Sequence, residues 1–564
     1  MRSGHQVDTN SALRKQAHLA LVENQHESIV SLLSKFGTAH NPDINAFIST
    51  IPEKLSSAAK ILLHRNEIID DLTLENRVNL KNFIQKFHSQ SQTGTSGMSD
   101  HLAMLDDKNT KIIVSIHQPN LFAYSGVFKK IVMAETLKRI IQESDRSKKI
   151  VTLFIIVDHD FINEFWVRSA ELPSCLHPSG KFQLRLPVNK SSRWQMICNV
   201  PTPSRLLLEE WNHRIRTWIK RSSSTPDVRQ LESNFELFWN EVELAYQKSK
   251  SYSDLNSFLI SQLVNNVIGY PTLFARLSEI SSVFENGFMH LINNFKTYSG
   301  TLRETETTLK SCGIHTGVSP NSSTSAPIWL HCKCGSKANM KLLSDHKLSM
   351  TGTCLGCKTH LEHTFSEGAK SELDLSDIID TISPRAIPIQ LLLARELGTT
   401  CYVSGIGGLG YLVDASVISR QLLINLPLVV IWPSKDIYAG VAQTQALRLT
   451  HSNDQGLETS LEELSAADAE YNHRIRVLID KRSELFRANR PIHHLLDDIL
   501  LLKEKQREIH KILKSMNRAT KALNLSPCIV DLAVNFGIVQ SQKQWERHLR
   551  EVDDLAAPVF MSKK

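Results

Sequence analysis

Two apolar, β-branched runs that flank one helical pattern constrain the fold of this chain most. Residues 112–116 form the first run, and residues 149–157 form the second. Between them, apolar side chains recur at helical spacing from residue 127 to 137. Parallel strands need a crossover connection, and a strand, a helix and a second strand in this order supply one. The sequence therefore predicts an α/β fold with a Rossmann-like parallel-sheet core and helical insertions.

Polar residues follow both predicted strands at the point where each strand ends. They are His117, Gln118, Asn120, Asp158, His159 and Asp160. Because the carboxyl ends of parallel strands meet at one edge of a sheet, where ligands bind in such folds, we expect the two groups to share a site. The two histidines and two aspartates are candidate catalytic residues, since imidazole and carboxylate groups act as acids and bases. The alternative is that each is a hydrogen-bonded structural group at a strand end.

A third strand-to-helix turn is rich in glycine. Residues 399–404 form a strand pattern, and Gly405, Gly407 and Gly410 then match the G-x-G-x-x-G spacing of dinucleotide-binding turns. A dinucleotide site also needs an acidic residue after the next strand, but that strand is followed by a proline, a serine and a lysine. We therefore predict a turn that lies on the same sheet edge as the polar groups, near a phosphate or carboxylate. An NAD site is the weaker alternative.

Four of the nine cysteines form two close pairs. They are Cys332, Cys334, Cys354 and Cys357. Two pairs joined by a hairpin-sized spacer supply the tetrahedral thiolate set of a structural zinc (Zn²⁺) site, which leaves no coordination position for a substrate. His331 or His360 could replace one ligand, and four ordinary thiols are the alternative. The sequence thus predicts a zinc ribbon.

The chain of 564 residues is too long for one ordinary core, so several units are expected. The expected units are an N-terminal helical region (1–108), the first half of the core with a helical insert (109–310), the zinc-ribbon insertion (311–370), the second half of the core (371–450), a hairpin (451–520) and a helical tail (521–564). In the hairpin, apolar residues keep a heptad-like spacing that Pro491 interrupts. This pattern predicts an antiparallel coiled coil that pairs two subunits into a homodimer or braces a neighbouring domain.

Composition and charge are those of a globular protein, with 41% hydrophobic and 22% charged residues. The formal net charge of +7 permits anionic substrates, but it is not gathered into the basic stripe that is typical of nucleic-acid-binding proteins. The longest apolar runs are shorter than the roughly 20 residues that cross a bilayer, and the first residues lack the apolar segment of a secretory signal. We expect a cytoplasmic protein that acts on small molecules and has no membrane partner.

Four motifs occur in an order that resembles one enzyme family. They are HQPNLF, DHDF, SYSDLNSFLISQLVNNVIG, and SPRAIPI with the strand and glycine turn that follow it. From about residue 112 to 440, the chain resembles the cysteine-adding ligases of bacillithiol synthesis (BshC). That family is similar to class I aminoacyl-tRNA synthetases in its Rossmann-like core. The resemblance implies a ligase that joins cysteine, or another amino acid, to the amino group of a small acceptor by an amide bond.

The resemblance also implies roles for individual residues. His117 and residues 158–160 would carry catalysis. The implied substrate-binding residues are Gln118, Asn120, Tyr124, Gly405, Gly407, Gly408 and Tyr411. Two of these positions depart from the family, because Asn120 replaces a glycine and Gly408 replaces a glutamate whose carboxylate could hold a substrate amine. The four-cysteine module is an insertion relative to the family, and the acceptor is left open.

Making an amide from a carboxylic acid requires an activated acyl group, normally an adenylate or an acyl phosphate, so ATP or another nucleotide is the expected cofactor. His117 would stabilise phosphate or carboxylate charge. His159 or a flanking carboxylate would take the proton of the amine, or Asp158 and Asp160 would hold a substrate ammonium. Two other classes stay open: a non-catalytic scaffold of zinc ribbon and coiled coil, and an NAD-dependent oxidoreductase that rests on the glycine turn alone.

Overall fold

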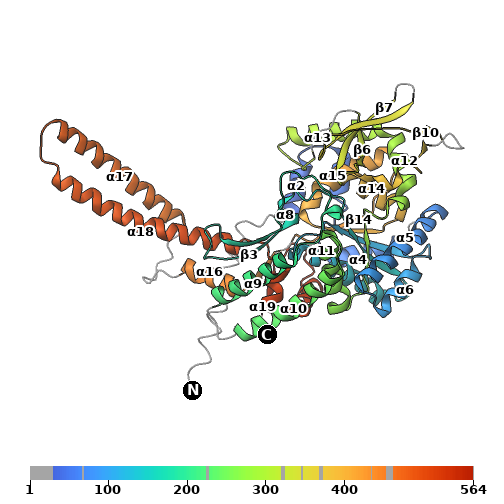
Figure 1. Cartoon of the computed structure of the whole chain (residues 1–564), viewed down its shortest axis with the longest axis horizontal. Helices are drawn as coiled ribbons and strands as arrows, with labels where there is room; N and C mark the ends of the chain where they lie inside the picture. The colour runs from blue at the N-terminus through green and yellow to red at the C-terminus, as the bar shows by residue number, and fades with distance from the viewer. Residues whose placement is uncertain are drawn as a thin grey trace, which may run out of the picture.

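The computed structural model describes residues 29–65, 69–223, 228–318, 324–344, 347–367, 373–433, 435–451 and 461–562. Most of these residues form an α/β body, and a long arm of two helices extends from one side of it (Figure 1). Residues 1–28 and 452–460, which belong to the predicted N-terminal region and hairpin, lie outside the described residues. The described N-terminal helices are α2 (Ile29–Gly37), α3 (Pro42–Ile48), α4 (Leu55–His64), α5 (Asp71–Ser91) and α6 (Ser96–Met104).

The body is built on a parallel sheet. Its strands are β1 (Lys111–His117), β2 (Ile150–Ile156), β5 (Leu273–Arg276), β13 (Cys401–Ser404) and β14 (Leu428–Ile431). They lie in the order β14-β13-β1-β2-β5, and every neighbouring pair is parallel. The prediction of an α/β fold on a parallel sheet is confirmed. When the five strands are numbered along the chain, they lie in the order 3-2-1-4-5, which is the arrangement of Rossmann-like sheets. The first three strands are added toward one edge of the sheet and the last two toward the other edge, so the strand order reverses between β1 and β13.

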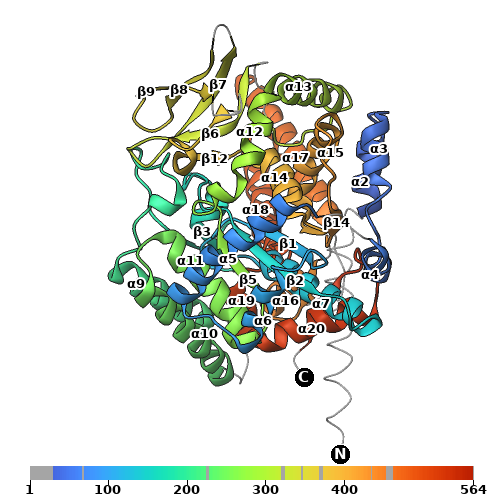
Figure 2. The same ribbon diagram turned by 90° about the vertical axis from the view of Figure 1, so that its right-hand side faces the viewer.

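Helices cover both faces of this sheet (Figure 2). On one face, α7 (Ser125–Ser144) packs beside α4 and α20 (Ile538–Glu551). On the other face lie α14 (Ala386–Leu397) and α15 (Leu409–Gln421). Alternate residues of β1 enter the two cores: Ile113 contributes to the α7 side, whereas Ile112 and Val114 contribute to the α14 and α15 side. Burial on both faces explains why the strands are continuous apolar runs.

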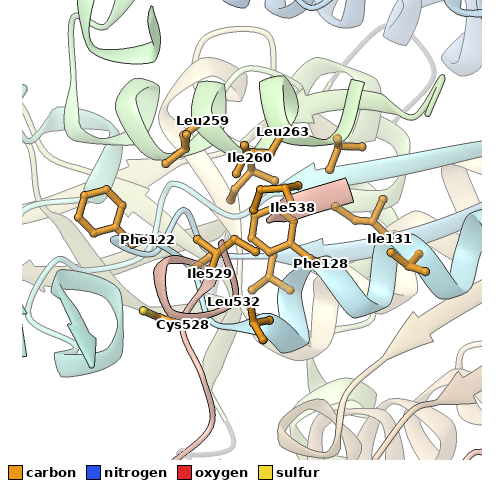
Figure 3. Packing of buried hydrophobic residues seen from close by; sticks show 14 of the residues in the cluster. Phe122, Phe128, Ile131, Leu259, Ile260, Leu263, Cys528, Ile529, Leu532 and Ile538 are labelled. Atoms are coloured by element: carbon orange, nitrogen blue, oxygen red, sulfur yellow. The ribbon is translucent and has the colours of Figure 1, made fainter. Parts of the chain in front are cut away.

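Segments far apart in sequence meet in the core on the α7 side (Figure 3). Phe128 of α7 lies beside Leu263 and Ile538, which come from the helical insert and the C-terminal tail. The insert contains β3 (Ser169–Pro173), β4 (Lys181–Arg185), α9 (Arg205–Ser222), α10 (Val228–Lys248) and α11 (Tyr252–Ser261), and the tail contains α19 (Ile529–Phe536) and β16 (Val559–Met561), which pairs with β15 (Asp436–Tyr438). The tail is therefore part of the body rather than an appendage.

A second, antiparallel sheet is inserted between β5 and β13. It follows α12 (Glu285–Asn293) and α13 (Phe295–Ser311), and its strands are β6 (Ser325–His331), β7 (Lys337–Ser344), β8 (Leu348–Cys354), β9 (His360–Thr364) and β12 (Ile382–Pro384). The order is β12-β6-β7-β8-β9. Because β12 leads directly into α14, this sheet is joined to the main body through its edge strand.

The arm consists of α17 (Leu461–Arg487) and α18 (His493–Leu523). The two helices lie side by side and run antiparallel, since a short turn at residues 488–492 connects them (Figure 1). Asp468 of α17 accepts a hydrogen bond from Gln506 of α18 at 3.2 Å and lies 2.8 Å from Nε2 of His510. The base of α18 packs on α16 (Val441–His451). Within the described residues, no helix combines the length and apolar character that crossing a bilayer requires.

Candidate functional site

A cavity of about 740 Å³ opens where the strand order reverses, at the carboxyl ends of β1 and β13. His117 and Gln118 line it from the end of β1, and Gly405 and Gly407 line it from the turn after β13. Neighbouring strands whose helices leave to opposite faces create a crevice, which is the usual ligand site of such sheets. The structure thus brings together the polar turn and the glycine turn that the sequence singled out.

His117 is held in one tautomer by its two partners. Nδ1 lies 2.9 Å from the carbonyl oxygen of Gln118, which can only accept, so Nδ1 carries the proton. Nε2 lies 3.1 Å from the hydroxyl of Tyr124, and it accepts from that hydroxyl. Burial and the positive charge of Lys130 lower the pKa of His117 to about 3, so the ring is neutral at physiological pH. In this arrangement Nε2 of His117 accepts rather than donates, and the expected role of His117 in stabilising phosphate or carboxylate charge stays a prediction.

Asp160 is the ionised carboxylate of the cavity. Its Oδ2 accepts from Nε2 of Gln118 at 2.8 Å, and its Oδ1 lies 3.5 Å from Nζ of Lys337. Burial alone would raise the pKa of Asp160, but the Lys337 charge and the Gln118 amide lower it overall. About a third of the side chain is exposed, at 35%. Asp160 therefore stays charged while it faces the cavity.

His159 also lines the cavity and is almost fully buried. Its Nε2 donates to the carbonyl oxygen of Pro384 at 3.1 Å, whereas Nδ1 has no hydrogen-bond partner among the described residues. Burial and the nearby Lys337 charge lower the pKa of His159 to about 3. The ring is thus a neutral acceptor whose Nδ1 lone pair is not engaged by another described residue.

Two predicted site residues, Asp158 and Asn120, do not line the cavity. The carboxylate of Asp158 is 0% exposed and accepts from the hydroxyl of Ser253 and from both the amide and the hydroxyl of Ser278. It ties the end of β2 to α11 and to the segment after β5. Asn120 is 2% exposed, and neither polar atom of its side chain has a hydrogen-bond partner among the described residues. Asp158 is therefore corrected from catalysis to a structural role, and Asn120 is corrected from the cavity wall to the interior.

The glycine turn meets the cavity through Gly405, Gly407 and Gly408, and Tyr411 lines the wall beside it. A Cβ on Gly407 would meet open space, whereas a Cβ on Gly408 would stand 2.5 Å from Oγ of Ser404. Only a residue without a side chain fits at Gly408 without displacing that serine. The glutamate that the family carries at this position would therefore require the hydroxyl of Ser404 to turn away.

Lysines that sequence reasoning missed give the cavity its positive side. Lys130 of α7 donates to the carbonyl oxygen of Ile116 at 3.2 Å, and its Cε lies 3.5 Å from the position that a Cβ on Gly405 would take. Burial lowers the pKa of Lys130 to about 8, and no carboxylate of the described residues forms an ion pair with it. Lys435 lines the same cavity. A lysine pair inside the apolar helix pattern, at residues 129 and 130, was the available signal.

Aromatic side chains form much of the remaining wall. They are Tyr124, Trp166, Trp329, Tyr402 and Trp432. Lys129 lies 4.5 Å from the ring centroid of Trp432 and pairs with Asp436 at 3.2 Å. Asp436 also accepts from Nε1 of Trp545 at 2.9 Å. Its carboxylate is therefore engaged and does not stand ready to bind a ribose.

The four cysteines lie together at one end of the antiparallel sheet. All four sulfur atoms lie within 4.8 Å of one another, and the Cys332 to Cys357 and Cys334 to Cys354 distances are each 3.5 Å. Disulfide sulfurs would be about 2 Å apart, whereas thiolates around a tetrahedral metal with bonds of about 2.3 Å are separated by about 3.8 Å. The cluster could hold a metal ion. His331 and His360 bond Ser383 and Thr351 instead, so neither belongs to the cluster.

The structural role of Asp158 can be tested by truncation. Asp158→Ala leaves one buried and two part-buried donors without their acceptor, and we expect a loss of about 2–4 kcal/mol in the free energy of unfolding. Urea unfolding would measure it, with Asp100→Ala on the exposed side of α6 as the control. A midpoint for Asp158→Ala equal to that of the control would contradict the assignment.

No protein-family model matches the chain, and no curated protein matches it significantly in sequence. The chemistry of the site is therefore inferred from its residues and their geometry.

Proposed function

We propose that this chain is a ligase that forms an amide between cysteine, or another amino acid, and a small amino-bearing acceptor. The observation that carries the proposal is the charge arrangement of the cavity. Lys130, an ammonium without an ion-pair partner among the described residues, stands beside the glycine turn, and the ionised Asp160 accepts from the side-chain amide of Gln118. One cavity can then hold an anionic group and the amino group of a second substrate, the two reactants that amide formation joins.

We assign the side of the cavity near Lys130 to binding the phosphate or carboxylate of the activated acyl substrate. The first turn of α15, at Leu409, leaves backbone N–H groups without helical partners, and these favour an anion. Lys130 adds a full charge in a site that is partly shielded from water, where it acts more strongly than in solution. ATP, or another nucleotide, would supply the activating phosphate. The aromatic wall could stack on a base.

We assign Asp160 as the residue that binds the ammonium of the amino substrate. The ammonium first loses one proton to water, because only the neutral amine has the lone pair that attack requires. The amine nitrogen then attacks the acyl carbon, the phosphate leaves with the electrons of its bond to that carbon, and the nitrogen releases a second proton. We assign Nδ1 of His159 as the acceptor of this proton, because the ring is neutral and Nδ1 is a buried atom with no hydrogen-bond partner among the described residues. His117 orients Gln118 and Tyr124.

The proposal keeps two further elements that the residue patterns of the sequence predict. The four-cysteine sheet is assigned as a zinc ribbon, since a closed set of four thiolates suits structural zinc. The arm of α17 and α18 is assigned as a coiled coil that pairs two copies of the chain. The glycine turn does not favour an NAD-dependent oxidoreductase, because the dinucleotide fingerprint belongs to the turn after β1, and this one follows β13.

Calorimetric titration of the purified chain with ATP, cysteine and NAD tests the proposal. We expect ATP and cysteine to bind and NAD not to bind. Lys130→Met should weaken ATP binding by about 10- to 100-fold, because it removes one charge-assisted contact of about 1.4–2.8 kcal/mol. Lys60→Met, an exposed lysine on α4, is the matched control. Binding of NAD but not of ATP or cysteine would support the alternative of an NAD-dependent oxidoreductase. If none of the three binds, the remaining alternative is a non-catalytic scaffold.

The pH dependence of ATP binding gives a second test. Lys130 is charged below its pKa of about 8 and neutral above it, so ATP affinity should fall as the pH rises through about 8. The terminal phosphate of ATP has a pKa of about 6, so a limb in that range belongs to the ligand and should be the same in wild type and variants. Lys130→Arg keeps its charge at high pH and should flatten the alkaline limb. An alkaline limb that persists unchanged in Lys130→Arg would contradict this assignment.

The metal assignment has its own test. The purified chain should contain one zinc ion, measured by elemental analysis, because four thiolates fill its coordination sphere. Cys357→Ser should lose the ion to a chelator far more readily than wild type does. Cys312→Ser, which removes an exposed cysteine outside the cluster, should retain it. Equal zinc retention in both variants would reject the site.

A further inference from the structure

The four-cysteine sheet reaches the cavity through Lys337. This lysine begins β7 and is 0% exposed. The loop of the first cysteine pair closes just before it, where Cys332 N donates to Ser336 O at 2.8 Å. The loop of the second pair bonds it directly, because Leu355 N donates to the carbonyl oxygen of Lys337 at 3.2 Å. Both cysteine loops thus fix the backbone from which Lys337 extends.

The side chain of Lys337 ends at the DHD turn, which we define as residues 158–160. Its Nζ lies 3.5 Å from Oδ1 of Asp160. The same Nζ lies 4.6 Å from the ring centroid of Phe161 and 4.7 Å from that of Trp329. A fully buried ammonium needs a compensating charge, and Asp160 supplies it while the rings add a weaker attraction. Lys337 therefore sets both the position and the charge state of the cavity carboxylate.

A second path joins the first cysteine loop to the backbone of the DHD turn. Gly335 O accepts from Met196 N at 3.0 Å and from the side-chain amide of Asn199 at 3.1 Å. The residues between these two donors bond onward, with Ile197 N donating to Asp160 O at 2.8 Å and Cys198 N donating to Asp158 O at 2.9 Å. Residues 195–199 therefore lie between the cysteine loop and the turn and bond to both.

A third path reaches His159. The edge strand β12 pairs with β6, which leads into Cys332, and Pro384 at the end of β12 accepts the Nε2 proton of His159. His331 bonds Ser383 of β12 at 2.9 Å in the same region. The residue that we assign as proton acceptor is thus held by the same sheet as Asp160.

We propose that a metal ion on the four cysteines positions the DHD turn, and that Lys337 is the positioning residue that connects the metal site with Asp160. Small sheets built around four thiolate ligands owe much of their order to the metal, because four cysteines without the ion provide no cross-link between their loops. Loss of the ion then frees both loops that hold Lys337 and Gly335. The inference rests on the proposed metal site and is independent of amide formation.

Hydrogen exchange on the full chain tests the coupling without a substrate. We expect peptides that cover residues 158–162 and 195–199 to exchange at least about tenfold faster after zinc is removed by a chelator, and to recover when zinc is restored. Peptides from α7 should be unchanged. Equal exchange of residues 195–199 with and without zinc would overturn the proposal, as would acceleration that includes α7, because that result would mean general unfolding.

Lys337→Met isolates the charge, since the apolar replacement still fits between the two rings and leaves a carboxylate that can reach solvent. Lys333→Met is the matched control, because Lys333 is an exposed lysine between Cys332 and Cys334. Both variants should keep their zinc. Binding of S-methylcysteine, whose sulfur cannot coordinate zinc as a thiolate, would be measured against pH.

Removing the Lys337 charge raises the pKa of Asp160, so the acid limb of binding should move to higher pH in Lys337→Met and stay in place in Lys333→Met. An unchanged limb in Lys337→Met would reject Lys337 as the positioning residue. If the wild-type chain binds no amino acid, the proposed function fails, and the exchange comparison alone decides whether the metal site is coupled to the turn.

Discussion

The reversal of strand order between β1 and β13 is the constraint on which the site depends. The chain leaves β1 toward α7 on one face of the sheet and leaves β13 toward α15 on the other. Neither helix can cover the gap between the two strand ends, so a crevice remains. The walls of that crevice must be the first residues after each strand, which here are His117, Gln118 and the turn at Gly405. The cavity therefore follows from topology before any side chain is considered.

Desolvation decides what the side chains in that crevice can do. Burial keeps His117 and His159 neutral and lowers the pKa of Lys130 to about 8, although each lies within reach of the cavity. Asp160 escapes the same penalty because Lys337 lies beside it. The outcome is a pocket that offers the ammonium of Lys130, the carboxylate of Asp160 and two neutral imidazoles to its ligands. Such a pocket suits two reactants of opposite charge. A reactant bound in the wrong orientation would place its charge beside a like charge of the pocket, which opposes that binding mode.

Sequence reasoning identified the sheet and the meeting of the two turns because both follow from local patterns. Continuous β-branched runs indicate buried parallel strands, and polar residues at strand ends must share an edge. Sequence reasoning could not separate Asp158 from Asp160, since residues two apart look alike in a DHD triplet and only the hydroxyls of Ser253 and Ser278 draw one of them inward. Lys130 was missed because its position depends on how α7 is rotated against the sheet. Lys337 was missed because its partner lies 177 residues away in sequence.

The place where the four-cysteine sheet is inserted explains why it can act on the cavity. The connection from β5 to β13 must carry the chain from one edge of the sheet across β2 and β1 to the far side of the strand reversal. It leaves β5 at the carboxyl edge, which is the edge that holds the crevice. The antiparallel sheet follows α12 and α13 in that connection, and its edge strand β12 reaches His159 before the chain enters α14. The same module inserted between α15 and β14 would instead start from the amino edge of the parallel sheet, away from the DHD turn.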